Sequence, residues 1–201
     1  MMKFILGKKL GMSQIYDKQG NAVPVTVIEA GPCFVTQVKE ENKDGYRAVQ
    51  VGLDKLRQNK IKRPQKDRPF KHLKEFRLVD DGKAEFKTGD KIDVSIFSEG
   101  DRIKVSAISM GKGFQGVVKR HGFSGGPASH GHRHVLRRPG SIGTSFPERV
   151  IKGKKMPGRA GAERVTIKNL KIAFVDSKNN LIAVSGAVPG PKGILVEINS
   201  I

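Results

Sequence analysis

The glycine-rich run GKGFQG, from Gly111 to Gly116, has the spacing of loops that bind nucleotide phosphates. Val118 extends the match to the form found in protein kinases. A dinucleotide site also needs an acidic residue about 20 positions further on, but no carboxylate follows before Glu148. The downstream strings H-R-D and D-F-G of a kinase are absent. The glycines therefore indicate a backbone that approaches another surface closely, with N–H groups that can meet phosphate oxygens.

The histidine run HGHRH, from His130 to His134, places imidazoles at alternate positions, with His121 nearby. On an extended segment, His130, His132 and His134 would share one face. A zinc site needs a fourth ligand, usually Cys or a carboxylate, and the only thiol, Cys33, lies far away in the sequence. No metal is therefore expected. A pH-dependent switch stays open, but contact with nucleic acid, beside the neighbouring arginines, is the favoured interpretation.

No group in the sequence is a candidate for catalysis. Several acidic residues lie in turn-like segments, where solvated or capping roles are expected, and nothing resembles a nucleophile elbow. Cys33 begins an apolar strand-like run and is predicted to be a packed structural thiol. A single cysteine excludes an intramolecular disulfide and fits a reducing compartment. We expect no catalytic residue, no cofactor and no small-molecule substrate.

The charge of the chain is concentrated in two segments. The formal net charge is +19 over 201 residues. Residues 111–164 carry 12 Lys or Arg against two Glu, and residues 55–77 carry 10 against two acids. From Arg102 to Pro147, 46 residues contain no carboxylate. Such segments bury little apolar surface, so they need an external polyanion, and nucleic acid is the natural candidate.

The near-neutral remainder reads as a mainly β protein. Short β-branched runs alternate with Gly, Pro, Asn and Asp, which is typical of a small barrel or sandwich. His72–Val79 is predicted to be a short helix. No span approaches the length needed to cross a membrane, and we expect no membrane partner and a cytoplasmic location. The predicted strands are Ala22–Glu29, Cys33–Lys39, Arg47–Leu53, Lys91–Phe97, Ile103–Ser109, Arg164–Val175, Leu181–Ala187 and Ile194–Ile198.

The two basic segments interrupt this β framework as insertions. Pro64 and Pro69 forbid a continuous helix in the first, and the second is far longer than ordinary loops. We therefore assign residues 1–54, 78–110 and 165–201 to a β body, a barrel or a sandwich, residues 55–77 to a basic insertion and residues 111–164 to an extended arm able to penetrate a folded nucleic acid.

RNA is favoured over DNA as the partner. No DNA-binding helix motif is visible, and few aromatic residues are available to stack on bases, so recognition of backbone and shape is expected. The predicted RNA-binding residues are the cations and imidazoles of the two basic segments: Lys60, Lys62, Arg63, Lys66, Arg68, Lys112, Lys119, Arg120, His121, His130, His132, Arg133, His134, Arg137, Arg138, Arg149, Lys152, Lys154, Lys155 and Arg159.

Several long strings resemble one family. RIKVSAISMGKGFQGVVKR, HGFSGGPASHGHRHVLRRPGSIG, GKKMPGRAGAERVTIKNLKI, LIAVSGAVPGPKG and the opening ILGKKLGMSQIYD are similar to the bacterial-type large-subunit ribosomal protein L-three family, in order along the whole chain. The resemblance implies a translation-protein-type β-barrel with an inserted α+β region and a long extended basic arm. It implies direct binding to large-subunit rRNA near its 3′ end, early in subunit assembly, beside ribosomal proteins fourteen and nineteen.

The resemblance also implies that the tip of the arm lies near the peptidyl transferase centre. Its residues are Gly140, Ser141, Gly143, Thr144, Ser145 and Phe146. Some bacterial members carry a methylated glutamine just after the Gly-Ser-x-Gly step, whereas Thr144 and Ser145 follow that step here. We predict that this modification is absent. Two alternatives remain: a transient RNA-binding assembly factor or chaperone, and an enzyme with a phosphate-binding glycine loop.

Overall fold

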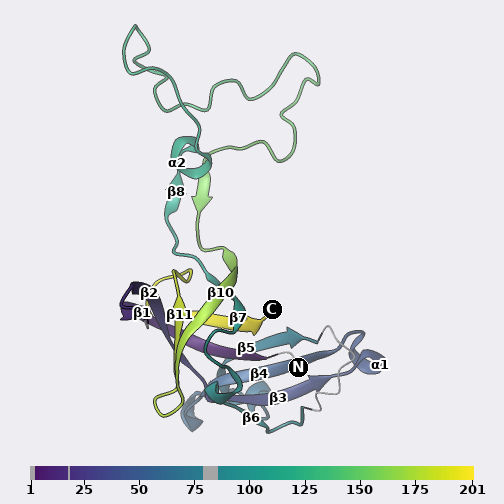
Figure 1. Cartoon of the computed structure of the whole chain (residues 1–201). Coiled ribbons are helices and arrows are strands. Elements are labelled where there is room, and N and C mark those ends of the chain that lie inside the picture. Colours follow the sequence, from purple (N-terminus) through teal and green to yellow (C-terminus); the bar gives the residue numbers. More distant parts are fainter. Residues whose placement is uncertain (1–2, 18, 79–85) are drawn as a thin grey trace. The chain divides into compact units, whose positions relative to one another are not determined.

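The computed structural model describes residues 3–17, 19–78 and 86–201 (Figure 1). The chain divides into two compact units. Met1–Ile108 together with Arg164–Ile201 form one unit, called the body here. Ser109–Glu163 form the other, called the basic unit.

Six antiparallel strands of the body form a closed barrel in the order β1-β12-β7-β10-β11-β2. Strand β7 shows why these residues form a barrel wall. Its apolar residues Ile103, Val105 and Ala107 alternate with polar ones and are all buried in the core. The strands are β1 Phe4–Tyr16, β2 Ala22–Ala30, β7 Arg102–Ile108, β10 Arg164–Asp176, β11 Leu181–Ser185 and β12 Leu195–Ser200.

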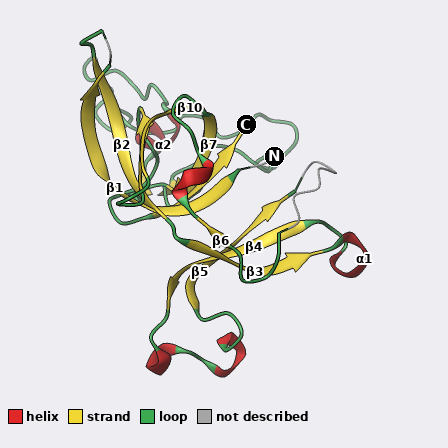
Figure 2. Ribbon diagram, turned by 60° about the horizontal axis from the view of Figure 1, so that its bottom comes forward, coloured by secondary structure: helices red, strands yellow, loops and turns green. Residues whose placement is uncertain are grey.

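A second sheet of the body has four strands in the order β5-β4-β3-β6 (Figure 2). They are β3 Cys33–Lys39, β4 Ala48–Lys55, β5 Phe70–Arg77 and β6 Lys91–Ile92. The short helix α1, Glu41–Asp44, connects β3 to β4, and two 3-10 turns, Gln58–Lys60 and Arg63–Gln65, lie between β4 and β5. The apolar residues of this sheet share one continuous core with the barrel, where Phe4 of β1 stacks on Phe76 of β5 with ring centroids 4.6 Å apart.

The prediction of a mainly β protein is confirmed, but two local predictions differ from the structure and one strand was not predicted. The described part of His72–Val79 is not a helix, because residues 72–77 pair with β4 as part of strand β5; Val79 lies outside the described residues. Of Lys91–Phe97, only Lys91–Ile92 is strand, and Val94–Ile96 form a 3-10 turn. Strand β1 was missed, because its glycines, lysines and serine hide the alternation.

The basic unit contains little regular structure. β8, Gly113–Gln115, pairs with β9, Gly158–Ala160, and the helix α2, Val117–His121, follows β8 directly (Figure 1). Gly122 ends α2 in the left-handed conformation. Within this fully described unit, Val117 is the only buried residue. The unit therefore has no hydrophobic core of its own that could hold the long segment between α2 and β9.

Candidate nucleic-acid interface

The basic unit presents its positive charge to its surroundings. It carries 11 Lys or Arg against Glu148 and Glu163. All its Lys and Arg side chains are exposed, and none of them forms an ion pair in this fully described unit. The charge is thus uncompensated within the unit, as an interface for a polyanion requires. The predicted residues exposed here are Lys112, Lys119, Arg120, Arg133, Arg137, Arg138, Arg149, Lys152, Lys154, Lys155 and Arg159.

Arg120 and His121 at the end of α2 also serve the unit itself. The Arg120 Nη1 group donates a hydrogen bond of 2.8 Å to the carbonyl oxygen of Met156. The His121 Nε2 atom lies 3.1 Å from the same oxygen. The two residues therefore close the base of the loop 122–155. Arg120 remains exposed, so part of its guanidinium is still accessible to an RNA phosphate.

A second contact joins two segments inside this loop. The backbone N–H of Gly126 donates to the carbonyl oxygen of Leu136 over 3.0 Å. Gly125 has a φ of +75°, and a Cβ there would collide with the same carbonyl group. Glycine is therefore required at position 125 by both conformation and space. The interpretation of the run Gly111–Gly116 stays a prediction, because a Cβ at Gly113 or Gly116 would meet no other segment within 4 Å.

The histidine run does not form an extended segment. Residues 129–137 form successive turns, in which the N–H of His132 bonds to the Ser129 carbonyl and the N–H of Val135 to the His132 carbonyl. His130 has a φ of +57°, which is not a strand conformation. His130, His132 and His134 are exposed, but they do not share one face of an extended strand. Across residues 3–17, 19–78 and 86–201, no group of three or more His, Cys, Asp or Glu could hold a metal ion.

The glycine-rich run also differs from a nucleotide-binding loop. Such a loop connects a strand to a helix, but Gly113–Gln115 is itself the strand β8, paired with Gly158–Ala160. The helix that follows has only five residues. Phe114 is 77% exposed. The glycine-rich run therefore forms part of a two-stranded sheet and not a phosphate-binding loop.

The predicted tip residues are held only by local contacts. The Ser141 hydroxyl donates to the Gly143 carbonyl over 2.7 Å, and the Thr144 hydroxyl donates to the Phe146 carbonyl over 2.8 Å. Ser145 and Gly140 are exposed, and Phe146 is 85% exposed. No hydrogen bond joins residues 140–146 to another segment of the described chain.

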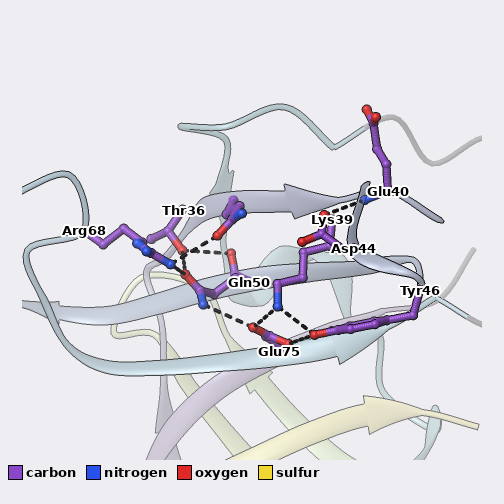
Figure 3. A network of polar contacts seen from close by, with 9 residues as sticks. Thr36, Lys39, Glu40, Asp44, Tyr46, Gln50, Arg68 and Glu75 are labelled. Atoms are coloured by element: carbon purple, nitrogen blue, oxygen red, sulfur yellow. Dashed lines mark hydrogen bonds and ion pairs between the residues drawn. The ribbon is translucent and has the colours of Figure 1, made fainter. Parts of the chain in front are cut away.

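The loop between β4 and β5 in the body carries further predicted cations. The loop contains two 3-10 turns, drawn as short helices in Figure 2. On or beside them lie the exposed Lys60, Lys62, Arg63 and Lys66. Arg68 differs, because its Nη1 group donates to the Oε1 atoms of Gln37 and Gln50, each over 3.1 Å (Figure 3). Arg68 thus attaches the end of the basic loop to β3 and β4.

The same polar network continues along the sheet (Figure 3). The Lys39 ammonium lies 2.9 Å from the Glu75 carboxylate and donates to the Tyr46 hydroxyl over 2.6 Å. Hydrogen bonding to Lys39 lowers the pKa of Glu75, and the Tyr46 and Glu75 partners raise the pKa of Lys39 above its ordinary range. The Gln50 amide donates to Glu75 over 3.3 Å and connects the two halves of the network.

Sequence reasoning missed a group of cations on the barrel wall. Lys104 of β7 and Arg164 and Lys168 of β10 line one cavity of the body. Their alternation with apolar residues was visible in the strings RIKVSAI and RVTIKNL, but in a strand such a pattern is typical of any solvated face. Only the fold brings side chains of different strands together there.

Two further features limit the chemistry of the chain. Cys33 is fully buried, and its Sγ group lies 3.4 Å from the carbonyl oxygen of Leu6. Burial raises the pKa of the Cys33 thiol to about 12, so the thiolate is not available at neutral pH.

In the described part of the chain, no helix has the length and apolar character to cross a membrane.

Comparison with known proteins supplies the family. The family described as ribosomal protein L3 matches residues 78–180. The "Large ribosomal subunit protein uL3" of Chloroherpeton thalassium is 48% identical, with 98% of each chain covered. The proteins of the same name from Desulfitobacterium hafniense and Carboxydothermus hydrogenoformans are 48% and 46% identical, covering 96% and 98% of this chain and 93% and 97% of theirs. The chain therefore belongs to the ribosomal protein L3 family, whose members are structural, non-enzymatic components of the large ribosomal subunit.

Proposed function

We propose that this ribosomal protein binds large-subunit rRNA directly near its 3′ end, acts early in subunit assembly and sends its basic unit toward the peptidyl transferase centre. One observation carries the proposal. The basic unit exposes 11 cations, contains two carboxylates and buries a single residue. A segment of this kind cannot be ordered by its own core, whereas neutralised phosphates would stabilise it.

The arrangement of the unit supports a division of labour. Cations lie on both limbs of the loop 122–155 and at its base, where Arg120 contacts Met156. Residues 140–146 carry no charged side chain. The cationic limbs would anchor the unit on rRNA backbone, and the small neutral tip would approach the peptidyl transferase RNA. Ribosomal proteins fourteen and nineteen would lie beside the body, in a fold that we assign to the translation-protein-type barrels.

Sedimentation tests the proposal against the alternative of a transient assembly factor. A tagged copy of the chain should remain with large subunits after a high-salt wash and be present in about one copy per subunit. Crosslinks from the basic unit should map to the 3′ part of large-subunit rRNA. Release of the chain by the wash, with binding only to immature particles, would favour the assembly factor and contradict the proposal.

A further inference from the structure

The body contains a cavity of about 380 Å³ between the barrel wall and strand β5. Its lining comes from four strands: β5, β7, β10 and β12. Four of the lining side chains are cations, namely Arg77, Lys104, Arg164 and Lys168, and two are acids, Glu75 and Glu197. None of these residues belongs to the basic unit.

Both acids already form ion pairs, mainly with cations that do not line the cavity. Lys39 lies 2.9 Å from Glu75. Lys74 lies 3.2 Å from Glu197, and Arg164 forms a second ion pair with the same carboxylate. Lys39 and Lys74 do not line the cavity. Lys39 and Lys74 therefore supply most of the charge that compensates the two acids. The cavity lining keeps an excess of positive charge.

The remaining cations have no acidic partner in the described chain. Neither Lys104 nor Lys168 takes part in an ion pair there, and Arg77 contacts only the face of the Tyr46 ring, 5.1 Å from its centroid. The Asn199 side chain lines the same cavity with its Oδ1 atom buried and unpaired among the described residues. Because Oδ1 is a fully buried acceptor, it offers no hydrogen-bond donor to a phosphate, and the identity of the occupant follows from the cations alone.

We infer that this cavity binds the sugar-phosphate backbone of RNA, as a contact of the body that is independent of the basic unit. The inference rests on the proposed function, because it assumes that RNA is the partner. Three uncompensated cations require several negative charges close together, and successive phosphates of one strand supply them. A single acidic side chain of a neighbouring protein would neutralise only one. Ser106 and Thr166 on the cavity wall share a hydrogen bond of 2.7 Å, which leaves one hydroxyl proton that can be donated to a phosphate or ribose oxygen.

The test uses the full chain, in-vitro-transcribed large-subunit rRNA and two double variants of equal charge change. Lys104→Gln with Lys168→Gln removes two cations from the cavity. Lys87→Gln with Lys178→Gln removes two exposed cations of the body that do not line it. Affinity is measured over a series of salt concentrations. Each lost phosphate contact reduces the magnitude of the slope of log K against log salt by about 0.7. The slope should therefore be shallower by roughly 1 to 1.5 in the cavity variant and almost unchanged in the control.

A footprint on the wild-type chain gives an independent readout, which does not depend on the folding of a variant. RNA should protect Lys104 and Lys168 from acetylation and leave Lys87 and Lys178 reactive. An unchanged slope overturns the inference, and so do unprotected Lys104 and Lys168 in the RNA complex. So does protection that occurs only in whole subunits and not in the binary RNA complex, because the occupant is then another protein. If the wild-type chain does not bind the rRNA, the proposed function itself fails; if it binds with Lys104 and Lys168 unprotected, only this inference fails.

Discussion

Arg120 and Met156, 36 positions apart, are joined by a hydrogen bond of 2.8 Å from the guanidinium of Arg120 to the carbonyl oxygen of Met156. The contact ties the end of helix α2 to the segment that leads into β9. It is a polar contact between exposed segments and buries little apolar surface. A residue predicted from charge alone to bind RNA therefore also holds the base of the loop that carries most of the other cations.

Arg120→Ala should loosen this loop in the free protein. Losing one hydrogen bond of about 1 kcal/mol raises the population of the opened state on the order of fivefold. Tryptic cleavage within residues 122–155 should accelerate accordingly. Lys119→Ala removes the same charge from the neighbouring exposed position and should leave the rate nearly unchanged, apart from the lost cleavage site. Equal rates for the two variants would show that the Met156 contact does not hold the loop.

Arg137 and Arg138 should contribute to the salt dependence of RNA binding. If about eight phosphates are neutralised with a coefficient of ~0.7 each, log K falls with log salt at a slope of roughly −5 to −6. Replacing both arginines by glutamine should weaken binding and flatten the slope by about one to two. The control is the double variant Lys87→Gln with Lys178→Gln. A slope unchanged from wild type would place the arginines away from phosphate.

A larger side chain at Gly143 should disturb the peptidyl transferase centre without blocking assembly. Gly140 has a φ of +78°, so a substitution there strains the backbone as well. Gly143 has no positive φ, and no atom beyond its chain neighbours lies within 4 Å of the position that a Cβ would take, so Gly143→Leu adds an apolar side chain without a clash in the free protein. We expect altered drug sensitivity and slower peptide transfer in subunits that still assemble. Normal peptide transfer together with failed assembly of the large subunit would indicate that residues 140–146 only pack against RNA.

Glu75→Gln should make the protein less stable at neutral pH but not in acid. The pKa of Glu75 is lowered in the folded state, mainly by its hydrogen bond with Lys39. The ionised carboxylate therefore stabilises the fold above its ordinary pKa, and this contribution is lost as the pH falls through the lowered value. Unfolding midpoints of wild type and variant should differ at pH 7 and converge as the pH falls below the lowered pKa of Glu75. Glu99→Gln, at an exposed turn, should match wild type throughout. A difference that persists in acid would assign the effect to packing.

Gly52→Ala should destabilise the four-stranded sheet. Gly52 of β4 pairs with Leu73 of β5, and a Cβ at position 52 would overlap the ring of Phe70. Forcing a methyl group into a packed core costs about 1–3 kcal/mol. Gly11→Ala in β1 meets only the flexible Lys192 side chain and is the matched control. Equilibrium unfolding in urea measures the free energy of unfolding of both variants. Equal values for the two would mean that the Phe70 ring moves aside without cost.

Several features of the protein were determined by the sequence itself. The charge pattern, with its long stretch free of carboxylates, predicted a segment without a core, and Ser109–Glu163 buries only Val117. The alternation of Ile103, Val105 and Ala107 predicted strand β7. The prediction of an L-three family member without enzymatic activity is confirmed by relatives 46–48% identical over nearly the whole chain. These properties are local or compositional, so they can be read without knowledge of the fold.

Other features were decided only by tertiary structure. Phe70, Leu73 and Phe76 have a spacing compatible with a helix, but pairing with β4 makes them part of strand β5. Arg68 was predicted from its charge to bind RNA, and only the fold shows that its Nη1 group also donates hydrogen bonds to Gln37 and Gln50. The cavity around Lys104 and Lys168 combines strands distant in sequence. A sequence pattern indicates which face of a strand a residue occupies. The neighbours of its side chain depend on strand register and on closure of the barrel, and both are set by contacts between residues distant in sequence.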